Sequence, residues 1–123
     1  MGEERDRPRV LVFEDDGDVA SLIVEILTSE GFDALHADHE SAPDALVRQR
    51  PHLLLLDLCL GARPGGEVLS ALRRSGLGDD VPVLLLSGKG DLEAQGHALG
   101  AAATLNKPFE IDALVATCWS LTA

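Results

Sequence analysis

Short apolar runs alternate with amphipathic segments along nearly the whole chain, and this alternation restricts the fold more than any other feature of the sequence. The predicted strands cover residues 10–13, 32–37, 53–56, 81–86 and 102–106. The predicted helices cover residues 19–27, 41–49, 67–74, 91–99 and 108–119. This order predicts an α/β fold, in which an open parallel sheet has helices on both of its faces. Leu53 to Leu56 are apolar at consecutive positions, as expected for a strand that is covered on both faces.

Glycine and proline residues mark several of the expected helix boundaries. Gly31 ends the first helix, whose apolar residues recur at the i, i+3, i+4, i+7 spacing of one helix face. Gly96 lies inside the predicted fourth helix, where glycine costs about 1 kcal/mol relative to alanine. Pro108 is expected at the first position of the last helix, where its missing N–H costs nothing. That helix carries an apolar stripe from Ile111 to Trp119.

Length and charge exclude several classes of protein. The 123 residues suffice for one domain, preceded by a polar segment at residues 1–9 that we expect to be disordered. The formal net charge of −11 argues against nucleic acid or an anionic membrane as a direct partner, because both would repel the chain. The longest apolar runs span four residues, whereas a membrane-spanning helix needs roughly 20. Two cysteines are too few for a disulfide framework, so we expect a cytoplasmic protein. We also expect it to be a monomer or a weak dimer.

Polar groups follow four of the five predicted strands. In open α/β sheets, ligands bind at the carboxyl ends of the strands. The residues at these ends are Glu14, Asp15 and Asp16 after the first strand, Asp57 after the third, Ser87 and Gly88 after the fourth, and Lys107 after the fifth. Taken singly, each has an ordinary structural explanation, because acidic residues cap helices, Asp and Ser-Gly form turns, and most lysines are solvated. Their convergence on one edge of the sheet favours a functional site.

The residue types at this edge are those that phosphoryl transfer requires. Carboxylates held close together repel one another unless a cation offsets their charge, and Mg²⁺ prefers oxygen ligands of this kind. An aspartate can also act as a nucleophile toward phosphorus and form an aspartyl phosphate. A lysine ammonium and a hydroxyl would then bind the phosphoryl oxygens. Gly88 would leave a path for the incoming group, because it has no side chain.

Four segments resemble the receiver domain of two-component signalling proteins in sequence, order and spacing. They are VLVFEDDGD (10–18), LLLLDL (53–58), PVLLLSG (82–88) and GAAATLNKPF (100–109). The resemblance covers residues 10–121 and implies a flavodoxin-like, doubly wound five-stranded parallel sheet in the order 2-1-3-4-5, with five helices. It also implies a response regulator that takes a phosphoryl group from the phosphohistidine of a histidine kinase or a histidine phosphotransfer protein. Such a domain is not a turnover enzyme.

The resemblance assigns a role to each polar residue at the sheet edge. The implied phosphoacceptor is Asp57. The residues implied to bind the phosphoryl group are Ser87, Gly88 and Lys107. The implied Mg²⁺ ligands are Glu14, Asp15, Asp57 and the backbone carbonyl of Cys59. Asp16 follows the acidic pair as a less critical acid.

Some positions depart from the family pattern or are expected to modulate it. Thr104 stands where the family usually has Tyr or Phe, and the family's usual proline is absent after Leu60. We expect the smaller side chain of Thr104 to limit any switch-like rearrangement around the fifth strand. Cys59 is a weak hydrogen-bonding partner for the water that hydrolyses an aspartyl phosphate. Lys89 is close enough in sequence to Ser87 to hold the phosphoryl oxygens, so we expect slow autodephosphorylation.

Other functions fit parts of the pattern. A haloacid-dehalogenase-like phosphatase needs a second Asp where Cys59 stands, and a flavodoxin-like cofactor binder needs a phosphate-cradling loop where residues 14–18 are acidic. A receiver that has lost phosphorylation and acts as a docking module stays open as an alternative, although the acceptor, the lysine and the acidic pair are all retained. A stand-alone regulator and a receiver cut from a larger protein also both stay open. The histidines expected at surface or strand-end positions are His36, His39, His52 and His97.

Overall fold

The central feature of the fold is a five-stranded parallel sheet. A computed structural model describes residues 7–14, 16–37, 47–57, 59–60, 63–78, 80–87 and 100–123. The strands of the sheet are β1 (Arg9–Phe13), β2 (Asp33–Ala37), β3 (Leu53–Asp57), β6 (Val83–Ser87) and β7 (Ala103–Asn106). Their order across the sheet is β2-β1-β3-β6-β7. This is the predicted 2-1-3-4-5 order, and the flavodoxin-like fold class is confirmed.

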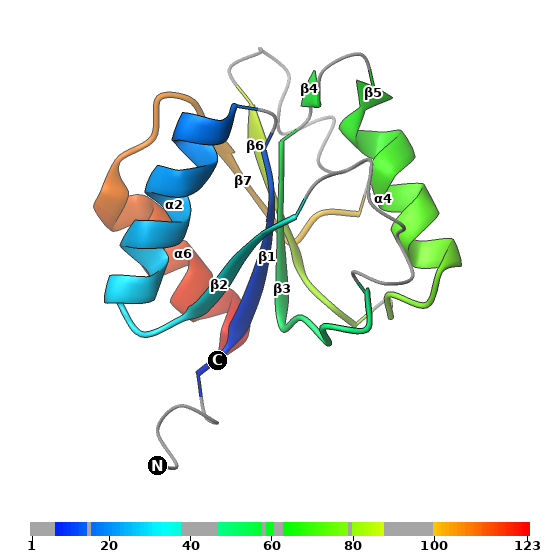
Figure 1. Cartoon of the computed structure of the whole chain (residues 1–123), viewed down its shortest axis with the longest axis horizontal. Coiled ribbons are helices and arrows are strands. Elements are labelled where there is room, and N and C mark those ends of the chain that lie inside the picture. The colour runs from blue at the N-terminus through cyan, green and yellow to red at the C-terminus, as the bar shows by residue number, and fades with distance from the viewer. Residues whose placement is uncertain are drawn as a thin grey trace.

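Helices cover both faces of the sheet. In the described part of the chain they are α2 (Gly17–Ser29), α4 (Gly65–Arg74) and α6 (Ile111–Thr122). Figure 1 shows α2 and α6 on one face and α4 on the other. The predicted helix at residues 91–99, and most of the one at residues 41–49, lie outside the described residues. Among the helices that are described, none is long and apolar enough to cross a membrane.

Successive residues of β3 alternate between two apolar layers. Leu54 and Leu56 pack in the layer beneath α4. Leu53 and Leu55 pack in the layer beneath α2 and α6. All four leucines have no exposed surface, as the run of apolar residues predicted for a strand covered on both faces. The central strand is therefore packed on both faces, and its carboxyl end places Asp57 at the edge of the sheet.

Six strand boundaries differ from the predicted ones by one or two residues, and two of these differences have a visible cause. β1 begins at Arg9, inside the segment expected to be disordered, because Arg9 pairs with Asp33 of β2. The guanidinium Nε of Arg9 also lies 2.8 Å from Asp33 Oδ2. β6 begins at Val83 rather than at residue 81, since Pro82 has no N–H to donate to the ladder and contributes only its carbonyl, which accepts from Leu54 N at 3.0 Å.

The loop after Asp57 contains a short strand pair that the glycine- and proline-rich sequence did not predict. β4 (Cys59–Leu60) and β5 (Arg63–Pro64) pair antiparallel, with Cys59 opposite Pro64. α4 follows directly and begins at Gly65, two residues before its predicted start. Figure 1 shows this strand pair at the carboxyl edge of the sheet, beside the start of α4.

The last helix begins later than predicted. Pro108 is not its first residue, because α6 starts at Ile111 after the N-cap residue Glu110. Leu114 N donates to Glu110 O at 3.0 Å in the first turn of the helix. The prediction for Pro108 was therefore wrong. Pro108 instead follows Lys107 through a cis peptide bond, in the turn that joins β7 to α6.

The apolar stripe of α6 is only partly buried. Leu114 and Cys118 have no exposed surface, whereas Ile111 is 53% exposed and Trp119 is 42% exposed. Trp119 nevertheless packs on Phe32, with ring centroids 4.3 Å apart. This contact ties the C-terminal part of α6 to the turn between α2 and β2.

Candidate functional site

The register of the sheet brings Glu14, Asp57, Ser87 and Lys107 to one edge. The last residue of β1 pairs with the residue before Asp57, so Glu14 and Asp57 lie side by side at the ends of adjacent strands. Ser87 ends β6 and pairs with Asn106, which directly precedes Lys107. This edge is at the top of Figure 1, at the opposite end of the sheet from the C-terminus. The strand ends therefore bring together residues that are far apart in the sequence.

Lys107 bridges the two carboxylates. Its Nζ lies 3.0 Å from Glu14 Oε1 and 2.5 Å from Asp57 Oδ2. The side chains of Glu14 and Asp57 are 3% and 6% exposed, and that of Lys107 is 29% exposed. These ion pairs are largely shielded from water, so the attraction between their charges is less screened than in pairs on an open surface.

Burial and neighbouring charges shift the ionisation of this cluster. Burial raises the pKa of Glu14, the hydrogen bond from Lys107 lowers it, and the closeness of Asp57 raises it again, so the pKa of Glu14 lies above its ordinary value. Burial lowers the pKa of Lys107, but the bonds to Asp57 and Glu14 outweigh this effect, so the pKa of Lys107 is raised. Lys107 therefore remains an ammonium ion near neutral pH.

The turn after β1 is held by hydrogen bonds from Asp16. The backbone N–H of Asp16 donates to Glu14 Oε2 at 3.3 Å. Its own Oδ1 accepts from the N–H groups of Asp18, at 2.9 Å, and Val19, at 3.3 Å. Asp16 is thus the N-cap of α2, in keeping with the ordinary explanation for an acidic residue before a helix.

The remaining predicted site residues are described to different extents. Ser87 is buried, and its carbonyl oxygen accepts from Lys107 N at 2.9 Å. Thr104 is half-buried in β7, opposite Leu85. The backbone of Cys59 lies in β4, but its side chain is not described. Three predicted residues lie outside the described ranges: Asp15, Gly88 and Lys89.

The described residues fit a divalent cation at this edge. Within the ranges that the structure covers, no group of three possible metal ligands is present, and Asp15 lies outside those ranges. Glu14 and Asp57 still supply hard oxygen donors of the kind that Mg²⁺ prefers. Both carboxylates contact the ammonium of Lys107. The raised pKa of Glu14 reflects its burial and its closeness to Asp57, and a bound cation would offset the repulsion between the two carboxylates.

One contact at this site is not predicted by the sequence. His36 of β2 is exposed, as expected, but its Nε2 lies 3.1 Å from the backbone carbonyl oxygen of Glu14. No motif indicates this contact, because it depends on the register between β2 and β1. His52, in contrast, lies at the other end of β1, where its Nδ1 accepts from Arg9 N at 2.9 Å.

Comparison with known proteins defines the class of the chain. The family of response regulator receiver domains matches residues 10–118, and the chain belongs to this family of signalling domains. It is 33% identical over 111 residues to the phosphate regulon transcriptional regulatory protein PhoB of Escherichia coli, covering 88% of this chain and 48% of that protein. It is 35% identical over 112 residues to the DNA-binding dual master transcriptional regulator RpaA of Synechocystis, covering 89% and 46%. The chain thus spans about half the length of these relatives.

Solved structures support the same class. The receiver domain of the Francisella response regulator 1452 superposes with a TM-score of 0.82 at 28% identity, covering 94% of this chain and 97% of that one. The chemotaxis protein CheY4 of Vibrio cholerae superposes with a TM-score of 0.83 at 24% identity, covering 94% and 98%. The second likeness concerns the fold alone.

Proposed function

We propose that this chain is a phosphoryl-accepting receiver domain in which Asp57 takes its phosphoryl group from the phosphohistidine of a histidine kinase or a histidine phosphotransfer protein. The observation that carries the proposal is the bridge from Lys107 Nζ to Glu14 Oε1 and Asp57 Oδ2, at 3.0 and 2.5 Å. Membership of the receiver family supports the same role. The bridge does not favour a phosphorylation-independent docking module, in which a buried charged cluster would have no chemical use.

The proposed step moves a phosphoryl group from nitrogen to oxygen. A carboxylate oxygen of Asp57 forms a bond to phosphorus while the P–N bond of the donor breaks. The electron pair of the broken P–N bond stays on the imidazole nitrogen of the donor. Proton exchange with solvent then leaves the donor as neutral histidine. The product is an aspartyl phosphate. Asp57 is the last residue of β3, so its carboxylate lies at the carboxyl edge of the sheet.

Lys107 has a direct role in this proposal. Its ammonium already lies within hydrogen-bonding distance of the attacking carboxylate, so a phosphoryl oxygen bound to Asp57 would come within its reach. The backbone bond from Lys107 N to Ser87 O, at 2.9 Å, holds the base of the side chain against β6. The raised pKa keeps the positive charge in place throughout the transfer. The Ser87 hydroxyl and the backbone at Gly88 are the proposed second set of phosphoryl contacts.

We further propose that Mg²⁺ is held by Glu14, Asp15, Asp57 and the backbone carbonyl of Cys59. When bound, the ion would supply positive charge that offsets the carboxylates and the phosphoryl oxygens. The chain's own contribution is to hold oxygen donors together at a buried edge. Glu14 is fixed there by Lys107 and by the backbone N–H of Asp16.

Phosphorylation by small-molecule donors tests the proposal. The protein is incubated with Mg²⁺ and either acetyl phosphate or phosphoramidate, whose P–N bond resembles that of phosphohistidine, and its intact mass is measured. We expect a gain of one phosphoryl group that EDTA suppresses and Asp57→Asn abolishes. Asp112→Asn, the same change at an exposed position of α6, should leave the gain unchanged. Phosphorylation that persists in Asp57→Asn, or that fails with both donors, would contradict the proposal.

A further inference from the structure

The imidazole of His36 contacts the turn that carries the acidic residues. Its Nε2 lies 3.1 Å from the carbonyl oxygen of Glu14. A carbonyl oxygen can only accept a hydrogen bond, so the ring must carry its hydrogen on Nε2. We propose that His36 is a positioning residue for the Mg²⁺ site, because this bond holds the backbone carbonyl of Glu14, one of the proposed ligands. The inference rests on the proposed Mg²⁺-dependent function.

The strand register explains how His36 reaches this peptide. Val12 of β1 pairs with His36, and Phe13 pairs with Ala37 in the last pair between the two strands. Glu14 therefore lies just beyond the paired part of β1. The side chain of His36 leans along the strand toward this carbonyl. The imidazole thus extends the contact between β1 and β2 to the residue that begins the acidic turn.

Glu14 is held by hydrogen bonds at three of its atoms. Its Oε1 accepts from Lys107 Nζ at 3.0 Å, and its Oε2 accepts from Asp16 N at 3.3 Å. These two bonds restrain the carboxylate. The bond from His36 restrains the backbone instead. Loss of the imidazole would leave both carboxylate bonds in place but would release the backbone carbonyl of Glu14. The Glu14 carboxylate would then be held less firmly beside Asp57.

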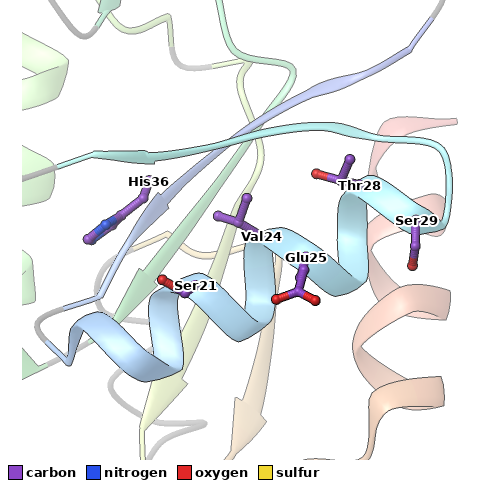
Figure 2. A pocket seen from close by; sticks show the side chains of 6 residues that line it. All are labelled: Ser21, Val24, Glu25, Thr28, Ser29 and His36. Carbon is purple, nitrogen blue, oxygen red and sulfur yellow. The ribbon is translucent and has the colours of Figure 1, made fainter.

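The exposure of the ring sets the expected size of the effect. His36 borders a groove of about 410 Å³ between α2 and β2, which is also lined by Ser21, Val24 and Glu25. Figure 2 shows the imidazole at the end of this groove where α2 begins, near Ser21. Water reaches a ring in this position, so the bond to Glu14 replaces a bond to water and its net contribution is modest. We therefore expect weaker Mg²⁺ binding without loss of the fold.

Calorimetric titration with Mg²⁺ tests the inference in the full chain. His36→Ala should raise the Kd for Mg²⁺ by about threefold to tenfold, the range of one ordinary hydrogen bond. His36→Gln should bring the Kd back to within about twofold of the wild-type value, since the glutamine amide nitrogen can donate from nearly the position of Nε2. His52→Ala is the matched control, because it removes an imidazole bond to the backbone at the opposite end of β1. Its Kd should not change.

Two further readouts separate positioning from general structural support. At saturating Mg²⁺, His36→Ala should reach the wild-type extent of phosphorylation by acetyl phosphate. Long-range ¹⁵N–¹H spectra of the wild-type protein at pH 8 should show His36 as the Nε2–H tautomer. An unchanged Kd in His36→Ala, an equal change in His52→Ala, or an Nδ1–H tautomer would overturn the inference. Normal Mg²⁺ binding without phosphorylation of Asp57 would overturn the proposed function alone.

Discussion

Replacing Lys107 with methionine removes the ammonium that bridges Glu14 and Asp57 and keeps an unbranched side chain of similar length. The two buried carboxylates then lose the positive charge that lies at 3.0 and 2.5 Å in the native protein. We expect the free energy of unfolding in EDTA to fall by about 2–3 kcal/mol, toward the lower end of the cost of breaking a buried ion pair.

The distances and the exposure set this magnitude. At an effective dielectric constant of about 20, each of the two contacts is worth roughly 6 kcal/mol before desolvation is counted. Desolvation of the ammonium offsets most of this attraction, and removing one partner of a buried pair costs about 3–5 kcal/mol. The Lys107 side chain is 29% exposed, and Glu14 can take up a proton in the variant. Both effects lower the expected loss to about 2–3 kcal/mol.

Urea unfolding, followed by the fluorescence of the single tryptophan, measures this loss. Arg74→Met removes an exposed cation from the end of α4 and should change the free energy of unfolding by less than about 0.5 kcal/mol. Mg²⁺ should stabilise Lys107→Met more than it stabilises the wild type, because the ion supplies the charge that the variant lacks. If the variant in EDTA is as stable as the wild type, or if Mg²⁺ stabilises both proteins equally, the electrostatic reasoning fails.

The pH dependence of this loss has a definite sign. The pKa of Glu14 in the folded protein lies above its ordinary value of 4.5. As the pH rises above that value, the unfolded chain releases a proton that the folded protein still holds, so the free energy of unfolding decreases. Loss of Lys107 removes a group that lowers the pKa of Glu14. The pH range in which the folded protein holds the extra proton then extends upward. The destabilisation by Lys107→Met should therefore be larger at pH 8 than at pH 5.5.

Three further predictions concern the packing and the proposed switch. Gly31→Ala should destabilise the protein by about 1–2 kcal/mol, because Gly31 has φ +105° and a Cβ there would lie 3.3 Å from the tryptophan ring. Gly17→Ala should cost less, because a Cβ at that position meets nothing within 4 Å. Equal losses of stability in the two variants would contradict this reasoning. Burial raises the pKa of the Cys118 thiol to about 12. The free energy of unfolding should therefore fall by up to about 1.4 kcal/mol per pH unit between about pH 9 and pH 10, below the range in which Lys107 titrates. Cys118→Ala should lose this slope in urea unfolding, and a slope that persists there would count against this assignment. A phosphoryl mimic should shift the amide resonances near Ser87 more than those of β7 and α6. Thr104 can move far less apolar surface than an aromatic residue, which lowers the free energy available for switching by an amount on the order of 2 kcal/mol. Large shifts throughout α6 would show that this face rearranges without an aromatic residue.

The sheet and most of the site edge were predictable because they depend on local patterns and general connection rules. Runs such as Leu53–Leu56 indicate buried strands, and a polar residue directly after each run marks the strand end. Resemblance to the receiver family supplied the strand order. Parallel strands share a carboxyl edge, so Asp57 and Lys107 could be expected together although 50 positions separate them.

The contacts that could not be predicted depend on register and on angular placement. The bond from His36 to Glu14 requires the pairing of β2 with β1 to be known residue by residue. The stripe on α6 indicates which face is apolar, but not that Trp119 packs against Phe32 at its margin. The prediction for Pro108 was wrong because a proline just before an apolar helical stripe fits two positions equally well. It can be the first residue of the helix, or it can lie in the turn that precedes the helix. Local sequence carries no distinction between these two positions.

The leucine run of β3 has a consequence for how the sheet aligns as it forms. A strand that slips along its neighbour normally exposes mismatched side chains, but sliding Leu53–Leu56 along β1 or β6 exchanges one leucine for another. Apolar packing alone therefore distinguishes poorly between neighbouring alignments. The charged residue at the end of the run does distinguish them, because a slip toward the interior would draw Asp57 between the apolar layers and away from Lys107. The proposed phosphoacceptor, Asp57, thus also favours one alignment of the central strand over its neighbours.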